Sequence, residues 1–208
     1  MFKAPINRVV LTVDTKYVRN FTSILKMAAI QNNSSVDPSD YVNIMGKVIS
    51  VPTAIADKRE YAGFSANDIL PGDTAIFSHE VIYSFSQTDP EAEPIYKNSV
   101  WYKGKEFFVA DITQIFAVIR DDKVRMLNGY VMVVEMQTPP KIILTAATKR
   151  NITAYEATVS QVQRDKEYIQ GDVIYYHPNK LMLYQINGKP FGILRERDIL
   201  GVKKSALI

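Results

Sequence analysis

The segment KPFGILRERDILGVKK, from Lys189 to Lys204, places two apolar clusters on either side of a charged, turn-like centre. An earlier segment, KEFFVADITQIFAVIR from Lys105 to Arg120, has a similar layout. The two align without a gap: Gly104 with Gly188, Lys105 with Lys189, Phe107 with Phe191, Ile115 with Ile199 and Val118 with Val202. This match indicates an internal repeat.

Three further blocks recur in the same order along the chain. RVVLTV at Arg8 parallels GYVMVV at Gly129, GKVISV at Gly46 parallels EATVSQV at Glu156, and DILPGDTAIF at Asp68 parallels EYIQGDVIYY at Glu167. Strand-rich sequences resemble one another by chance, but here the Gly-Asp and Gly-Lys pairs recur in register as well. We therefore predict two domains, residues 1–122 and 123–208, joined by the short linker RDDKVR.

Most of the chain has the composition of short β-strands. Stretches rich in Val, Ile, Tyr and Phe alternate with Gly, Pro, Asn and Asp, which predicts an all-β protein made of antiparallel barrels or sandwiches. One helix is expected, over Asn20 to Gln31, because Phe21, Leu25, Ala28 and Ala29 can share one face.

Composition narrows the function classes. The 208 residues are 47% hydrophobic and 23% charged, with a net charge of +3, which does not indicate a dedicated nucleic-acid binder. No apolar run approaches the ~18 residues of a membrane helix. We expect a soluble, cytoplasmic protein that binds neither nucleic acid nor membrane.

Catalytic motifs are not evident. The chain has no cysteine, which excludes a thiol nucleophile or a Cys-ligated zinc site. His79 and His177 each follow a Gly-Asp strand of a repeat, so both read as turn residues. No phosphate-binding loop or nucleophile elbow occurs. We expect no enzyme activity, cofactor or metal.

The order of motifs in each half is a strand, a variable loop, a strand, a Gly-Asp strand, a hairpin and a closing segment. This order resembles the GroES-like (chaperonin-10) family, most clearly over residues 129–208. The resemblance implies two tandem GroES-like antiparallel β-barrels, with the one short helix in the first. It also implies a non-catalytic co-chaperonin that assembles into a ring and caps a chaperonin cage.

Some features depart from the family pattern. Only eight positions separate Val134 from Ile142, which is short for the mobile loop of the family, and the insert from Ser86 to Trp101 is not a family feature. Divergent GroES-like proteins occur in bacteriophages. The alternative function is therefore a structural, capsid-associated virion protein that reuses the barrels, located in the virion and not in the cytoplasm.

The resemblance implies where a partner would bind. The family presents an apolar tripeptide on its mobile loop, and Ile142, Ile143 and Leu144 occupy that place between two prolines and a small, polar stretch. Ile24 and Leu25 correspond to them in the first half. The alternatives are a buried strand for the tripeptide and an amphipathic core helix for the first-half pair.

The last strand of the closing segment has two possible pairings. An unpaired strand edge invites pairing with another chain, although a last strand can also pair only within its own barrel. The resemblance favours a homo-oligomer, with the chaperonin ring or other virion proteins as partners. It assigns the subunit interface to Phe191, Ile193, Leu194, Ile199, Leu200 and Val202.

Overall fold

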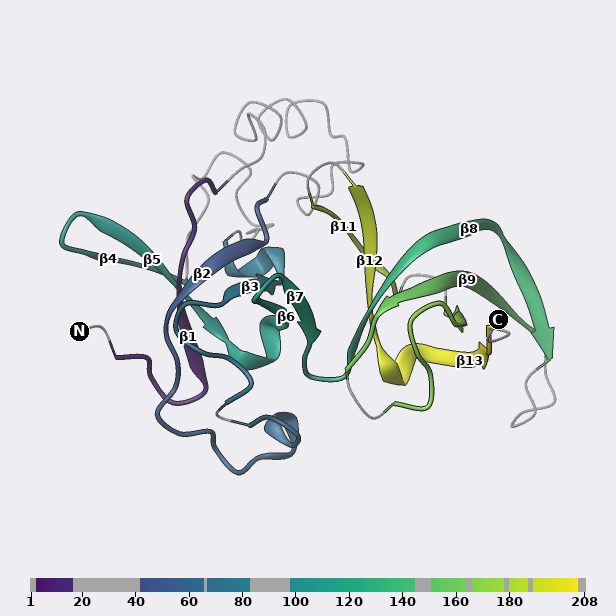
Figure 1. Cartoon of the computed structure of the whole chain (residues 1–208), viewed down its shortest axis with the longest axis horizontal. Helices are drawn as coiled ribbons and strands as arrows, with labels where there is room; N and C mark the ends of the chain where they lie inside the picture. Colours follow the sequence, from purple (N-terminus) through teal and green to yellow (C-terminus); the bar gives the residue numbers. More distant parts are fainter. Residues whose placement is uncertain are drawn as a thin grey trace, which may run out of the picture. The chain divides into compact units, whose positions relative to one another are not determined.

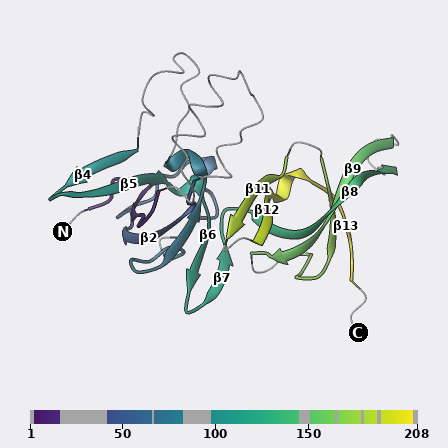
Figure 2. The same cartoon turned by 90° about the horizontal axis from the view of Figure 1, so that it is seen from above.

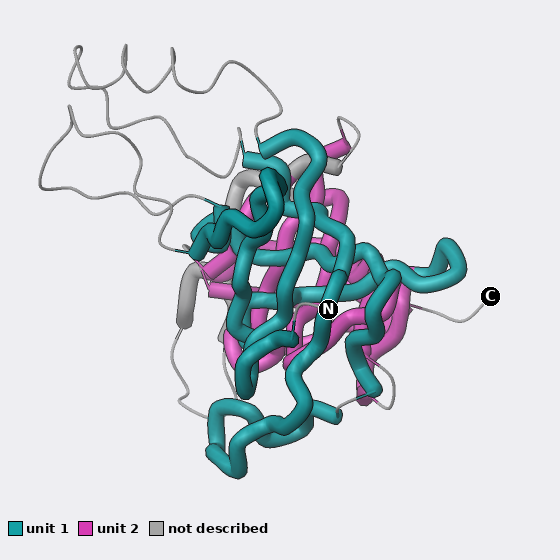
Figure 3. Tube along the Cα trace, turned by 90° about the vertical axis from the view of Figure 1, so that its left-hand side faces the viewer, with its two compact units in different colours: residues 1–123 teal, residues 124–208 magenta. Residues whose placement is uncertain are grey.

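Two compact units divide the chain, Met1–Lys123 and Val124–Ile208 (Figure 3). The computed structural model describes residues 3–16, 42–65, 67–82, 98–144, 151–163, 166–177, 180–186 and 189–205. Over these residues both units consist of antiparallel strands and short 3-10 helices, so the fold is all-β (Figure 1). The predicted helix from Asn20 to Gln31, with Ile24 and Leu25, lies outside the described residues.

The first unit is built on a seven-stranded sheet in the order β4-β5-β1-β2-β3-β6-β7. The strands of this sheet are β1 (Arg8–Thr12), β2 (Met45–Ser50), β3 (Thr74–Phe77), β4 (Ser99–Tyr102), β5 (Lys105–Asp111), β6 (Ile115–Arg120) and β7 (Lys123–Met126). Strand β7 begins at the last residue of the first unit and continues into the second. Its 3-10 helices are η2 (Arg59–Tyr61), η3 (His79–Val81) and η4 (Ile112–Gln114).

The second unit is built on a six-stranded sheet in the order β11-β12-β8-β9-β10-β13 (Figure 2). Its strands are β8 (Tyr130–Leu144), β9 (Asn151–Gln161), β10 (Val173–Tyr176), β11 (Met182–Ile186), β12 (Lys189–Arg195) and β13 (Ile199–Lys203). The 3-10 helix η5 (Glu196–Asp198) connects its last two strands.

The two sheets share one topology. The first six strands of each unit follow the same order along the chain and the same order across the sheet, and a 3-10 helix joins the fifth strand to the sixth in both. The strands β5 and β12, and the helices η4 and η5, begin at positions that the gapless sequence alignment pairs. The internal repeat in the sequence is thus also a repeat of strand order.

Strand register and bulges repeat as well. In the β3–β6 pair, Ala75 faces Val118 and the register shifts after Ile76; in the β10–β13 pair, Ile174 faces Val202 and the register shifts after Tyr175. The β1–β2 and β8–β9 pairs also share a shift at the same step. Since a bulge re-aims the side chains beyond it, the two units direct equivalent residues to the same face.

One alignment derived from the sequence is wrong by a single residue. Arg8 pairs with Asp111, and Tyr130 pairs with Arg195, so Tyr130 and not Gly129 is the structural counterpart of Arg8. The runs VVLT and VMVV contain no Gly or Pro that would mark the register. A slip of one residue exchanges the two faces of a strand, so the correction matters for assigning the core.

The structure adds detail to the linker and corrects one strand prediction. The short linker RDDKVR contains a two-residue hairpin turn between β6 and β7, since Asp121 and Asp122 both have positive φ (51° and 57°), as such a turn requires. The stretch EVIYSF, which reads as a strand, begins within the 3-10 helix η3, where the Ser78 hydroxyl accepts a hydrogen bond from Glu80 N.

Candidate functional site

The tripeptide Ile142–Leu144 lies at the end of strand β8. Its backbone pairs with β9, with Ile142 facing Thr153, Ile143 facing Ile152 and Leu144 facing Asn151. The expectation of a loop is therefore replaced by the outer end of a two-stranded hairpin. The docking role of these three side chains stays a prediction.

The hairpin ladder is interrupted between its base and its outer end. Pairing shifts register between Val134 and Gln137 and again between Gln137 and Lys141. Pro139 and Pro140 fall in the second gap, and proline cannot donate a ladder hydrogen bond. The outer part that carries the tripeptide is thus joined to the base of the hairpin through a segment of irregular pairing.

The closing segment divides into buried and accessible residues. Phe191, Ile193 and Leu194 on β12 are buried, and Leu194 belongs to a core cluster with Val131, Val133, Ala157, Val159, Tyr168, Ile174 and Tyr176. Their packing is intramolecular. On β13, Ile199 and Leu200 are half-buried and Val202 is 38% exposed, so the accessible part of the predicted interface is β13.

Comparison of β6 with β13 shows why β13 is accessible. Strand β6 lies between β3 and β7, and its Val118 is 0% exposed. Strand β13 pairs with β10 at the end of the six-stranded sheet, and the described residues supply no strand on its other side. The exposed surface of Val202, the counterpart of Val118, is thus on an edge strand that has no equivalent of β7.

A buried aspartate ties the Gly-Asp turn of each unit to the end of the closing segment. In the first unit, the Arg120 guanidinium donates two hydrogen bonds of 2.8 Å to the Asp73 carboxylate. In the second, Asp172 accepts hydrogen bonds from the Lys204 ammonium (3.2 Å) and from Ser205 N (2.9 Å). The gapless alignment pairs Arg120 with Lys204, so this tie is also repeated.

The turn that presents each aspartate is the same in both units. Gly72 and Gly171 have φ of 98° and 92°, a region that favours glycine. The following carboxylate accepts a hydrogen bond from the residue that opens the turn, Leu70 N or Ile169 N. Each aspartate therefore closes its own turn and also anchors the last strand of its unit.

The environment of both carboxylates favours the charged form. Burial opposes ionisation of Asp73, but hydrogen bonds from Arg120 and from Leu70 N outweigh it and lower the pKa of Asp73. Hydrogen bonds from the backbone N–H groups of Ile169 and Ser205 lower the pKa of Asp172 to about 2. Both carboxylates are thus ionised at neutral pH, and their hydrogen bonds stabilise the turn and the last strand of each unit.

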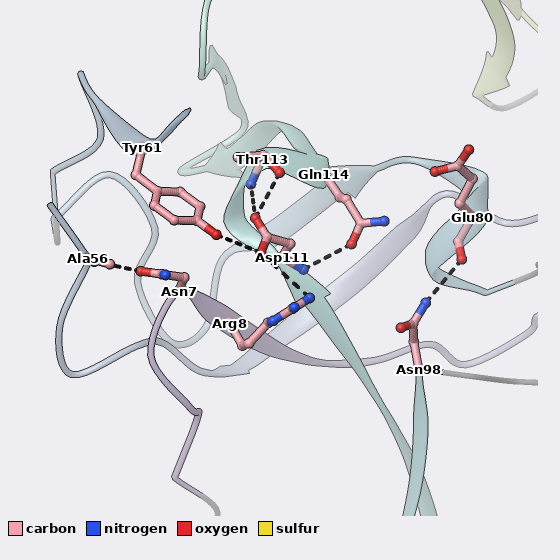
Figure 4. A network of polar contacts seen from close by, with 9 residues as sticks. All are labelled: Asn7, Arg8, Ala56, Tyr61, Glu80, Asn98, Asp111, Thr113 and Gln114. Carbon is pink, nitrogen blue, oxygen red and sulfur yellow. Dashed lines mark hydrogen bonds and ion pairs between the residues drawn. The ribbon is translucent and has the colours of Figure 1, made fainter. Parts of the chain in front are cut away.

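A third carboxylate, Asp111, is the centre of the polar network in Figure 4. It accepts hydrogen bonds from Thr113 N (3.0 Å) and from the Tyr61 hydroxyl (3.2 Å), and Arg8 lies 3.6 Å away. Burial and the Asp111 carboxylate raise the pKa of Tyr61. Since Tyr61 belongs to η2, this network fastens the segment between β2 and β3 to the sheet.

The second unit has a different pair at the position of Arg8 and Asp111. There the Arg195 guanidinium lies 5.2 Å from the centre of the Tyr130 ring, a cation–π contact. The two units thus use different chemistry to join their first and fifth strands. This difference indicates that the Asp111 network stabilises one unit and is not a shared functional centre.

Metal-ligating side chains do not cluster among the described residues. No three His, Cys, Asp or Glu side chains among them gather closely enough to hold a metal ion. In the same part of the chain, no helix combines the length and apolar character needed to cross a membrane.

Sequence reasoning missed two features of this region. The Gly-Asp pairs were visible, but their cationic partners were not assigned, although Arg120 and Lys204 stand at matching positions. The strand β4 was also missed, because Ser99, Val100 and Trp101 fall in a segment that reads as an insert. The available signal was the run Val100, Trp101 and Tyr102, which are residue types that favour strands.

Comparison of the sequence with models of known protein families and with curated proteins gives no match. The likeness between the two units of the chain therefore carries the functional argument.

Proposed function

We propose that this chain is a non-catalytic, co-chaperonin-like protein that assembles into a ring through its strand edges and caps a chaperonin cage. The observation that carries the proposal is the unequal covering of two equivalent strands, β6 and β13. In this proposal each sheet is a GroES-like barrel, and the protein acts in the cytoplasm of its host or of a cell infected by a bacteriophage.

The assembly part of the proposal follows from strand covering. In the seven-stranded sheet, the outer edge of β6 pairs with one more strand, β7. A second copy that supplies such a strand to β13 would satisfy the edge N–H and C=O groups and would cover Val202. Repetition of a head-to-tail contact gives a closed ring when the rotation between copies closes.

The capping part of the proposal concerns the β8–β9 hairpin. Three aliphatic residues at its outer end, Ile142, Ile143 and Leu144, would enter an apolar groove of the chaperonin. Burial of one such side chain contributes about 1.5–3 kcal/mol, from which the cost of ordering the segment is subtracted. Several weak contacts around a ring would add through multivalency.

One observation favours the alternative function, a structural virion protein. The backbone of the tripeptide is paired with β9 through Leu144 and Asn151, which is compatible with a hairpin that packs permanently in an assembly. In that case the tripeptide would stabilise the second unit or a permanent contact between subunits, and no chaperonin would be bound.

The two functions are separated by changing the tripeptide to serine in the full chain. The co-chaperonin proposal expects the triple variant to keep its melting temperature and to lose retention on an ATP-loaded chaperonin ring. A matched control is Leu183→Ser, because Leu183 is an exposed aliphatic residue on another strand of the second unit. Retention that is absent for the unmodified chain, or a large fall in melting temperature of the triple variant, would support the structural alternative.

A further inference from the structure

The hairpin formed by β4 and β5 leaves a cluster of large apolar side chains in water. Val100, Trp101 and Tyr102 are 41%, 68% and 46% exposed. They are consecutive in an edge strand, so they lie on both faces of the hairpin. Figures 1 and 2 show this hairpin extending away from the rest of its sheet.

The repeat provides an internal reference for this hairpin. The equivalent hairpin in the second unit, β11–β12, pairs Tyr184 with Phe191, whereas β4–β5 pairs Val100 with Phe107 at the same place. Tyr184 is only 2% exposed, with its ring 6.0 Å from that of Phe191. Val100 is therefore exposed at a position where the equivalent side chain of the second unit, Tyr184, is buried.

Polar contacts at the base and a tight turn at the tip hold the two ends of the exposed hairpin. The Asn98 side-chain amide donates to Glu80 O (3.2 Å), and the Lys16 ammonium lies 2.6 Å from the Glu106 carboxylate on the neighbouring strand. At the tip, Lys103 and Gly104 have φ of 49° and 73°, the geometry of a two-residue hairpin turn. An edge whose two ends are already held in place loses less conformational entropy when it binds a partner.

The backbone pattern identifies which groups of β4 face outward. Asn98 O accepts a hydrogen bond from Val109 N at 2.8 Å, so the hydrogen-bonded pairs with β5 fall at Asn98 and at every second residue after it. The N–H and C=O groups of Ser99 and Trp101 then point away from β5. Among the described residues, no strand lies on that side.

We propose that a second copy of this chain covers β4, by antiparallel pairing of the two β4 strands about a two-fold axis at Trp101. This register brings the outward backbone groups of Trp101 against those of Trp101 in the second copy. Residues directly opposite in an antiparallel pair share a face, so Val100 lies against Tyr102 of the second copy.

Charge also fits this register. Lys103 of one copy lies opposite Ser99 of the other, so no two like charges are placed directly across the new pair, and each exposed apolar residue meets another apolar residue. The contact is closed, since the same patch serves both copies. It is separate from the contact proposed for β13 and does not depend on it.

Trp101 provides a direct measurement, because it is the single tryptophan of the chain. Acrylamide quenching of its fluorescence in a dilution series, beside sedimentation velocity on the same samples, follows its burial as copies associate. The proposal expects quenching to rise as the protein is diluted and the paired species dissociates.

Two variants keep Trp101 as the probe and weaken the pairing. Val100→Lys places a charge against Tyr102 of the second copy and is expected to raise the dissociation constant about tenfold or more. Tyr102→Lys places a charge against Val100 of the second copy and is expected to act in the same direction. Leu183→Lys, on the exposed edge strand β11, is the control and should leave the dilution curve unchanged.

Two results would overturn the proposal. The first is quenching that does not change with concentration in a protein that sediments as a single monomeric species. The second is concentration-dependent quenching that persists in both β4 variants and disappears in Val202→Lys, which would place the contact on β13 instead.

Discussion

At the scale of single residues, Asp73 and Asp172 perform the same task with different partners. Asp73 is held by a two-pronged guanidinium, and Asp172 by an ammonium together with the N–H and hydroxyl groups of Ser205. A planar guanidinium bonds both carboxylate oxygens at once, whereas an ammonium acts as a point charge. The two closing strands are therefore anchored by interactions of different geometry.

The lowered pKa of Asp172 predicts how stability changes with pH. A carboxyl group whose pKa is lower in the folded state stabilises the fold above the unfolded pKa of about 3.9. That contribution is lost as the pH falls from about 4 towards 2, the pKa of Asp172 in the folded chain. Asp172→Asn should lower stability at neutral pH and reduce its loss between pH 4 and 2, measured by urea denaturation. An unchanged pH profile of the free energy of unfolding would show that the ionised form of Asp172 does not stabilise the fold.

Removal of the partner of Asp73 should be costly. Arg120→Met leaves a buried carboxylate without its charged donor, and the free energy of unfolding should fall by about 1–3 kcal/mol. The control is Lys123→Met, because Lys123 is exposed at the start of β7 and its change should stay within about 0.5 kcal/mol. Equal effects of the two substitutions in urea denaturation would contradict a special role for Arg120.

At the scale of elements, the two units fill equivalent places with different side chains. Phe108 on β5 is buried and pairs with Leu11, whereas Gly192 on β12 pairs with Val133. A Cβ added at Gly192 would lie 2.4 Å from Leu181 Cδ1. The side chain of Leu181 therefore occupies the space beside Gly192, and position 192 has no room for a side chain.

This compensation predicts the effect of Gly192→Ala. In a strand the substitution would ordinarily be favourable or neutral for the backbone, but the clash with Leu181 and Val133 should lower the free energy of unfolding by about 1–3 kcal/mol. Combining it with Leu181→Ala should give less than the sum of the two single effects, as measured by urea denaturation. Strict additivity would show that the two side chains do not compete for one space.

Much of this organisation could be predicted from the sequence wherever glycine, proline or aspartate marked the register. The gapless match between the closing segments placed β5, η4 and β6 against β12, η5 and β13. The run after Arg8 contains no Gly or Pro, and the sequence alignment of this run with its repeat was wrong by one residue. Strand ends and chain turns are encoded by special residues, whereas the position of a repeated valine run is decided by packing.

The candidate site was less predictable for a related reason. Phe191, Ile193 and Leu194 have the same apolar character as Val202, yet the first three are buried and Val202 is 38% exposed. Which apolar strand faces a core depends on which strands lie beside it. That is a property of sheet order, and no local pattern in the chain records it.

At the scale of the whole molecule, the proposed assembly depends on strand edges that no other strand covers. Val202 is exposed on β13, and it faces Ile174 across the strand pair. Lysine at position 202 can extend its charged end to water in the isolated chain, but would place that charge against a covering strand. Val202→Lys should therefore keep the fold and disrupt assembly, whereas Ile199→Lys should also destabilise the unit, because Ile199 packs against its core.

The two substitutions can be separated by thermal melting beside size measurement. Val202→Lys is expected to melt within a few degrees of the unmodified chain, since surface changes usually cost under about 0.5 kcal/mol. Ile199→Lys should melt at a clearly lower temperature. Loss of folding in both variants would mean that the β13 edge is needed within the unit itself.

Assembly through the β13 edge is tested by sedimentation velocity of the unmodified chain and of Val202→Lys at micromolar concentration. We predict a discrete, ring-sized assembly for the unmodified protein and its dissociation in the variant, while Leu183→Lys assembles normally. An unmodified chain that sediments as a monomer, or an assembly that Val202→Lys leaves intact, would contradict assembly through the β13 edge.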